Sequence, residues 1–326
     1  MRYTDILRNS DTAPDPEPKG RAVPFADAGG IQPEPPPGTN RGLTERLFPV
    51  LSRTAGEVAD AIQQGRPIPL DAVRKAIAAC VREIGNSEAR ITPLAPPCNH
   101  AYYVRNLTLN ALCSLQLGRG LGFPKEKMED LGLAAILHDV GIFRVPAEVL
   151  LASRALSASE RDLVERHPVL GSEMLKPFEK DFPWLPLIPL QEHEREKGLG
   201  YPKQINASET HEYARIVGMV DVYEAILNTR PYRPARLPDQ ALREIIMLQD
   251  ANGYPRDLVR VLIQEFTLFP IGARVRLSSG ETAAVGQVHP LSPFSPTVEI
   301  LEGTRKGTTL DLSHDPLIFV QEALAG

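Results

Sequence analysis

Acidic and histidine side chains stand at positions where the surrounding pattern predicts hydrophobic residues. In the segment AAILHDVGIFRVP, residues 134–146, His138 and Asp139 follow an apolar run directly and precede Gly141. Burying two ionisable groups at the end of an apolar helix costs free energy unless a partner compensates them. The partner could be a backbone hydrogen bond, an ion pair or a metal ion, and this segment alone leaves the three open.

Three further segments place the same residue types in apolar surroundings. They contain His167, the pair Glu192 and His193, and Asp221, which shares the apolar side of its helix with Val217 by the i, i+4 rule. A single buried histidine is more often a satisfied core residue than a ligand. Four such segments together favour a shared metal site, and mixed imidazole and carboxylate ligands suit Fe, Mn or Zn.

The elements that would position these residues are predominantly helical. Apolar residues recur at helical spacing in 102–123, 125–139, 158–168, 209–229 and 257–266. Ser157 and Glu160 form the pattern of a capping box at the start of the third segment. Residues 101–268 are therefore predicted to form a mainly α bundle.

The two ends of the chain differ from this bundle. Residues 1–40 are rich in proline and poor in large apolar residues, which predicts a disordered tail. Residues 41–90 predict a helical hairpin whose second helix is capped by Asp71. Beyond Pro270, short alternating runs around a Ser-Gly turn predict a small all-β domain, a barrel-like or curled sheet, over 269–326.

Composition narrows the range of functions. A net charge of -5 argues against general binding of polymeric nucleic acid. The three cysteines form no CxxC pair, so neither a disulfide framework nor a cysteine zinc site is expected. No segment approaches the length of a membrane-spanning helix, and the first residues lack the apolar run of a signal peptide. A cytoplasmic location is the expectation.

The motif order resembles that of the HD-GYP family, a branch of the HD-domain metal-dependent phosphohydrolases. The resemblance rests on the four segments that contain these acidic and histidine residues, together with GYP at 200–202 and RPYR at 230–233, and it covers about 100–268. It implies an HD-domain helical bundle over 91–268 and hydrolysis of cyclic di-GMP, a bacterial signalling dinucleotide. The β domain is similar to the C-terminal extension of some members.

Carried over by position, the resemblance implies a centre of two divalent metal ions, with Fe or Mn favoured and Zn as an alternative. Asp139 would bridge the metals and is the expected catalytic residue. His138 and Asp221 would complete one metal site, and His167, His193 and Glu192 would serve the other. Such a centre attacks a phosphodiester with a hydroxide that both metals activate.

The resemblance also implies substrate-binding residues. Tyr201 would stack on or hydrogen-bond with the substrate, and Arg230 and Arg233, one turn apart, would clamp phosphates. Arg195 is interpreted as a solvated surface charge, and the second GYP, at 253–255, as an ordinary turn.

Several positions depart from the family pattern. The family's phosphate-facing lysine is Ile142, its first histidine is Asn106, the first histidine of its HHE segment is Glu192, and the aspartate before its GYP is Lys197. Three prolines, at 183, 186 and 189, interrupt the segment before His193 and are expected to displace it.

These departures leave two main hypotheses. One is a phosphodiesterase for cyclic di-GMP or a related phosphoester, and the other is a catalytically weak or silent module that senses a nucleotide or binds a protein. A phosphohydrolase for a different nucleotide is disfavoured by the intact GYP and RPYR segments. The tail and the hairpin are candidates for contacts in a homodimer or with a signalling partner.

Overall fold

The computed structural model describes residues 42–91, 93, 102–150, 152, 154, 156–228, 238–250, 253–266, 269, 271–289, 292, 294–315 and 317–324. The predicted tail, 1–40, lies outside these residues.

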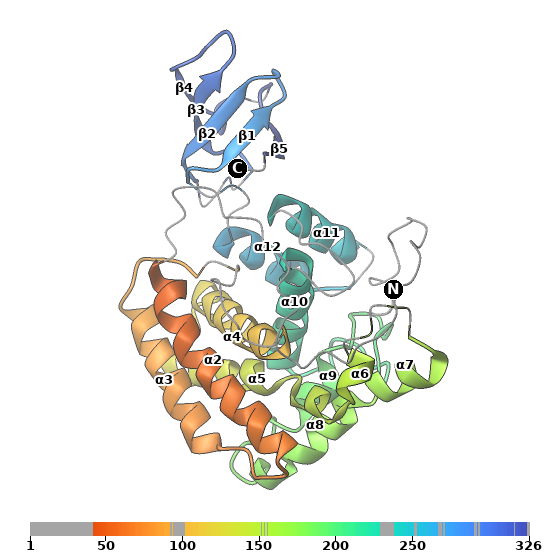
Figure 1. Ribbon diagram of the computed structural model, residues 1–326. Helices are drawn as coiled ribbons and strands as arrows, with labels where there is room; N and C mark the ends of the chain where they lie inside the picture. Colours follow the sequence, from red (N-terminus) through yellow and green to blue (C-terminus); the bar gives the residue numbers. More distant parts are fainter. Residues whose placement is uncertain are drawn as a thin grey trace.

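The architecture is mainly α with a small C-terminal antiparallel sheet, which confirms the predicted fold class (Figure 1). The helices are α2 (Gly42–Gln63), α3 (Leu70–Gly85), α4 (Tyr102–Gly120), α5 (Lys125–Leu137), α6 (Ala147–Leu150), α7 (Ala158–Val164), α8 (His167–Leu175), α9 (Leu187–Gln191), α10 (Glu212–Leu227), α11 (Pro238–Asp250) and α12 (Arg256–Glu265), with the short 3-10 helices η1 (Val140–Arg144) and η2 (Lys176–Phe178). The strands are β1 (Arg274–Leu277), β2 (Thr282–Gln287), β3 (Thr297–Glu302), β4 (Thr309–Asp311) and β5 (Val320–Ala323).

Helices α2 and α3 lie side by side and form the first hairpin (Figure 1). Each buries the apolar stripe that the sequence predicts, for example Leu51 on α2 and Ile77 on α3. Helix α3 begins directly after Pro69, so Asp71 lies in the first turn and is not the cap that was predicted. The hairpin covers the bundle because α2 packs on α4 and α3 packs on α5.

Helices α4 and α10 form the centre of the bundle and bury residues around most of their circumference. They pack against each other, and α5 contacts both. Polar side chains on these helices are consequently buried as well, among them Asn106 and Asp221. Because buried polar groups require partners, these side chains must meet other polar groups inside the bundle.

The sheet has the strand order β4-β3-β2-β1-β5 with antiparallel pairing throughout. Its first two strands form the predicted hairpin, with Val275 opposite Ala283 and Gly280 at φ 84° in the turn. This left-handed conformation favours glycine. Strands β4 and β5 are the two edges, and no pairing among the described residues closes the sheet into a barrel.

A buried carboxylate ties together two turns of this sheet. Glu281 precedes β2 and accepts hydrogen bonds from the backbone N–H and the guanidinium of Arg305, in the turn between β3 and β4. Ser279 also donates to it. The hydrogen bond from the Arg305 side chain is the main reason that the pKa of Glu281 falls to about 2.

Replacing Glu281 by glutamine is therefore expected to lower the thermal unfolding midpoint at neutral pH. The folded-state pKa lies below the ordinary value of 4.5, so the carboxylate stabilises the fold above about pH 4.5 and loses this effect as the pH falls to 2. Calorimetry of both proteins should show a difference that disappears near pH 2. Glu299→Gln, at an exposed position of β3, is the matched control. Equal midpoints at pH 7 would contradict this assignment.

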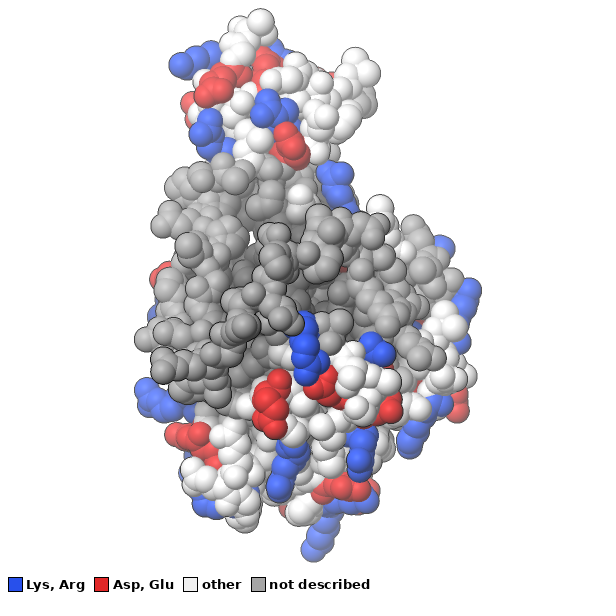
Figure 2. All heavy atoms as spheres, turned by 45° about the vertical axis from the view of Figure 1, so that its right-hand side comes forward, with Lys and Arg blue, Asp and Glu red and all other residues white. Residues whose placement is uncertain are grey.

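The described surface carries charges of both signs. On the face drawn in Figure 2, Lys and Arg side chains are interspersed with Asp and Glu over the helices and the sheet. None of the helices in the described part of the chain combines the length and the apolar character that crossing a bilayer requires.

Candidate metal centre

His138 lies at the point where α5 gives way to η1, and its ring is buried. Its Nδ1 donates a hydrogen bond to the carbonyl oxygen of Ala135, at 2.7 Å. Because a carbonyl can only accept, the proton is on Nδ1 and Nε2 faces the interior. Nε2 lies 3.6 Å from Glu192 Oε2 and 3.8 Å from Asp221 Oδ1.

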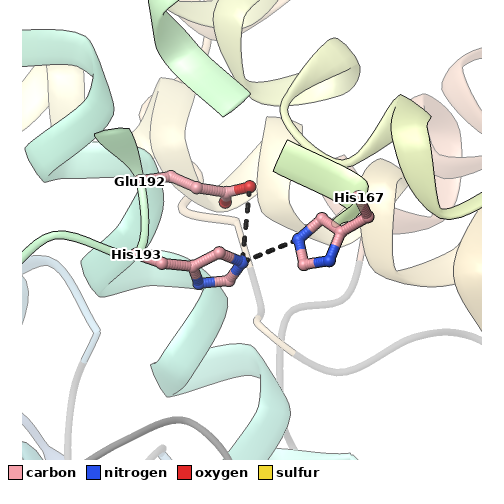
Figure 3. A group of neighbouring side chains, drawn as sticks. All are labelled: His167, Glu192 and His193. Carbon is pink, nitrogen blue, oxygen red and sulfur yellow. Dashed lines mark hydrogen bonds and ion pairs between the residues drawn. The ribbon is translucent and has the colours of Figure 1, made fainter. Parts of the chain in front are cut away.

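His167, the first residue of α8, is oriented in the same way. Its Nδ1 donates to the carbonyl oxygen of Val164 at 2.7 Å, and its Nε2 lies 2.9 Å from Nε2 of His193 (Figure 3). The two rings are perpendicular. The same His167 atom lies 3.3 Å from Asp139 Oδ1. A backbone hydrogen bond on one ring nitrogen, which fixes the other as a ligand, is typical of metal-binding histidines.

Glycine permits this approach of η1 to α8. A Cβ atom at Gly141 would lie 2.0 Å from the carbonyl oxygen of His167, so no larger residue fits between the two segments. Asp139, two residues before Gly141, is thereby held beside the His167 ring.

Glu192 is fully buried, and its carboxylate faces both His138 and His193. Its Oε2 is the atom near His138, and its Oε1 lies 3.7 Å from Nε2 of His193 (Figure 3). Neither Glu192 oxygen has a hydrogen-bond partner among the described residues, and His138 Nε2 has none either. Buried polar atoms without partners are rare and costly. A bound cation is the partner that three converging ligand atoms of this kind fit, so the residues present suit a divalent metal.

Asp221, on α10, is held by Asn106, which stands where the family pattern has its first histidine. Nδ2 of Asn106 donates to Asp221 Oδ1 at 3.0 Å and to Glu224 Oε2 at 2.8 Å. Glu224 is fully buried and was not identified from the sequence. Its position three residues after Asp221, on the same side of an apolar helix, is the signal that could have revealed it.

The charges of the site influence one another strongly. Burial lowers the pKa of His138, but the carboxylates of Glu192, Asp221 and Asp139 outweigh burial and raise it to about 10. Burial raises the pKa of Glu192 well above its ordinary value. Burial and the neighbouring His167 hold the pKa of His193 well below its usual range. The acids of this buried site thus raise the proton affinity of His138, and a cation would relieve the same negative charge.

The structure brings together all six residues that were predicted as ligands, although they come from separate segments of the chain. They are His138, Asp139, His167, Glu192, His193 and Asp221. Ligand atoms of three of them, His167, Glu192 and His193, lie within 4.8 Å of one another. The expected displacement of His193 is wrong: α9 is only five residues long and contains Pro189, yet His193 directly contacts His167.

The other predicted residues have different surroundings. Tyr201 stacks on the ring of His193, with centroids 4.5 Å apart. Arg230 and Arg233 lie outside the described residues. Lys197 is exposed.

Two minor interpretations are corrected. Arg195 is half-buried, and its guanidinium donates to the backbone carbonyls of Glu192 and Glu194 instead of projecting into solvent. It also lies over the ring of Tyr254, which is buried, so the second GYP segment is more than a surface turn. Both residues support the segment that carries Glu192.

Ile142, at the position of the family's lysine, is buried in a small apolar cluster with Val145, Val149 and Leu150. A lysine there would have to place its ammonium group among these side chains or direct it into the metal centre.

Ile142→Lys is expected to lower the free energy of unfolding by about 3 kcal/mol, because an unpaired charge would enter an apolar cluster. Urea unfolding measures the change. Ile271→Lys, at a position that is 52% exposed, is the matched control and should change the stability by no more than about 0.5 kcal/mol. Unchanged stability of the Ile142 variant would indicate that the ammonium group reaches the metal centre.

Comparisons with known proteins agree with this geometry. The family described as HD domain matches residues 76–257, more than half of the chain. A cyclic di-GMP phosphodiesterase of Pseudomonas aeruginosa is 32% identical over 198 residues, which are 60% of this chain and 47% of that protein. The cyclic di-GMP phosphodiesterase response regulator RpfG of Xanthomonas campestris is 38% identical over 123 residues, 37% of this chain and 32% of that protein.

Among solved structures, an HDG"Y"P protein from Bdellovibrio bacteriovorus aligns with a TM-score of 0.49 and 16% identity, over 69% of this chain and 73% of its own. The matched part of the chain covers about a third to a half of the length of the two phosphodiesterases from Pseudomonas aeruginosa and Xanthomonas campestris. The match to the family begins at residue 76, inside α3, so the domain boundary expected at 91 stays a prediction. The matched family, the relatives and the order of the motifs agree, and the chain belongs to the HD-domain family as a member of its HD-GYP type.

Proposed function

We propose that this protein is a metal-dependent phosphohydrolase that cleaves a phosphodiester bond of a cyclic dinucleotide, with cyclic di-GMP as the first candidate. The observation that carries the proposal is the convergence of partnerless buried ligand atoms from His138 and Glu192 beside the facing nitrogens of His167 and His193. Relatives named as cyclic di-GMP phosphodiesterases support the substrate class.

The centre is proposed to hold two divalent cations, Fe or Mn before Zn, because carboxylates make up half of the ligand set. His138 and Asp221 form the first metal position, and His167 and His193 form the second. Asp139 lies beside the second position and would contribute to both. The chemistry that such a centre supplies is the activation of water and the neutralisation of charge on the phosphoryl oxygens.

The chain's own residues prepare the site in two ways. Hydrogen bonds to Ala135 and Val164 fix the rings of His138 and His167 so that Nε2 is the ligand atom on each. Burial of five of the six ligand side chains, all except Asp139, excludes water from them, which strengthens their electrostatic interactions with a bound cation. Tyr201 supports the His193 ring and is proposed to contact the substrate; Arg230 and Arg233 are proposed to bind its phosphates.

The second candidate is a cyclic-dinucleotide sensor with little or no activity. The burial of Ile142 in an apolar cluster favours it, because the cation that the family places beside the phosphate is missing at this position. Loss of one such electrostatic contact costs roughly two to three orders of magnitude in rate.

The full chain should be purified under anaerobic conditions, loaded with Mn²⁺ or Fe²⁺, and assayed for metal content and for conversion of cyclic di-GMP to the linear dinucleotide. Two metal ions per chain with linear product support the enzyme. Binding of cyclic di-GMP without product supports the sensor. A protein that retains no divalent metal and binds no cyclic dinucleotide overturns both.

A further inference from the structure

The carboxylate of Glu192 presents one oxygen toward His138 and the other toward His193, the histidines of the two proposed metal positions. Oε2 is 3.6 Å from His138 Nε2, at the first position, and Oε1 is 3.7 Å from His193 Nε2, at the second. No described residue donates a hydrogen bond to either oxygen. The side chain is fully buried, so solvent does not satisfy these oxygens.

The backbone of Glu192 is fixed in this place. Its carbonyl oxygen would lie only 1.9 Å from a Cβ atom at Gly218, so helix α10 contacts this segment directly. Arg195 donates to the same carbonyl group at 3.1 Å. The backbone from which the carboxylate projects is thus held in place by two contacts.

Asn106, a neighbouring polar side chain, does not take this role. Its amide nitrogen donates to Asp221 and Glu224, and its amide group has only one oxygen, so it does not offer a separate oxygen to each of two cations. Each histidine offers one ring nitrogen to one cation. A carboxylate, in contrast, can bind two cations through its two oxygens.

We propose that Glu192 bridges the two metal positions, with Oε2 as a ligand at the first and Oε1 as a ligand at the second. This inference rests on the proposed function for the two-metal centre. If Glu192 and Asp139 are both shared, each metal position has four protein ligands: two residues of its own and the two shared carboxylates. If Glu192 bound only one metal, the other position would have three.

The test compares Glu192→His with Glu192→Gln and the wild type. An imidazole can replace a ligand that serves one metal, but it cannot bridge two. The full-length proteins are equilibrated with Mn²⁺, and bound manganese is measured by elemental analysis and by electron paramagnetic resonance, which distinguishes a coupled pair from isolated ions. Neither readout depends on catalysis.

The expected result is two coupled ions in the wild type and one uncoupled ion in both variants, with the affinity for the second ion at least about 100-fold weaker. Glu194→Gln is the matched control, since its carboxylate is also buried but accepts from the backbone N–H of Lys203 at 2.7 Å. It should retain the coupled pair.

Two coupled ions in Glu192→His would overturn the bridge and leave the proposed function intact. If that variant does not fold, two tightly bound ions in the nearly isosteric Glu192→Gln would overturn the bridge equally. A wild-type protein that binds no manganese or iron overturns the two-metal centre itself. Circular dichroism of every protein verifies the fold.

Discussion

Replacing His167 by alanine is expected to reduce phosphodiester turnover by about a thousand-fold or more, because one removed ligand weakens both the retention of metal and the stabilisation of phosphoryl charge. His167 Nε2 is the atom that lies close to both His193 and Asp139, so its loss affects two further groups of the centre. The measurement is the rate of linear dinucleotide formation at saturating Mn²⁺, together with the number of ions bound per chain.

A thermal readout separates lost metal from lost fold. A metal at a hundred times its dissociation constant stabilises a native protein by about 2.7 kcal/mol, so Mn²⁺ should raise the unfolding midpoint of the wild type. The His167 variant should show a much smaller rise. His289→Ala is the matched control because His289 pairs with Asp311 in the sheet, away from the centre. Equal turnover and equal metal stabilisation in the His167 variant would contradict its role as a ligand.

The long helices were predictable because their periodicity extends over several turns. Helices α4, α5 and α10 bury the apolar residues that their spacing indicates. Helix α9 was not predictable in this way, since five residues that include Pro189 cover little more than one turn. Its position depends on packing against α8 and α10 instead of on local pattern.

The ligand segments were predictable for a different reason. Ionisable residues at apolar positions carry a free-energy cost, so each of these positions indicates a partner elsewhere in the fold. The partners themselves depend on tertiary packing. Asn106 reaches Asp221 across 115 residues only because α4 lies against α10. The placement of the Glu192 carboxylate was not predictable for the same reason. The sequence shows a carboxylate in place of an imidazole, but only tertiary packing makes its two oxygens face His138 and His193.

Alanine at Gly218 is expected to lower the free energy of unfolding by about 3 kcal/mol and to weaken metal binding. In an isolated helix alanine is favoured over glycine by about 1 kcal/mol, so local propensity predicts the opposite sign. The added Cβ would lie 1.9 Å from the Glu192 carbonyl oxygen, a backbone atom that cannot move without the segment that carries Glu192 and His193. Overpacking of this kind displaces the backbone.

Gly56→Ala is the matched control for this substitution. Gly56 also lies inside a helix, α2, but a Cβ atom added there would meet nothing within 4 Å, so alanine should stabilise the protein by about 0.5–1 kcal/mol. Urea unfolding without metal measures both changes, and Mn²⁺ titration then shows whether the Gly218 variant alone loses affinity. If both variants gained stability and bound manganese equally well, the contact between α10 and the Glu192 segment would not be what holds the metal ligands in place. If only the Gly218 variant loses both, the close approach of two backbones positions the centre, and glycine at 218 is required by that contact rather than by the conformation of its own helix.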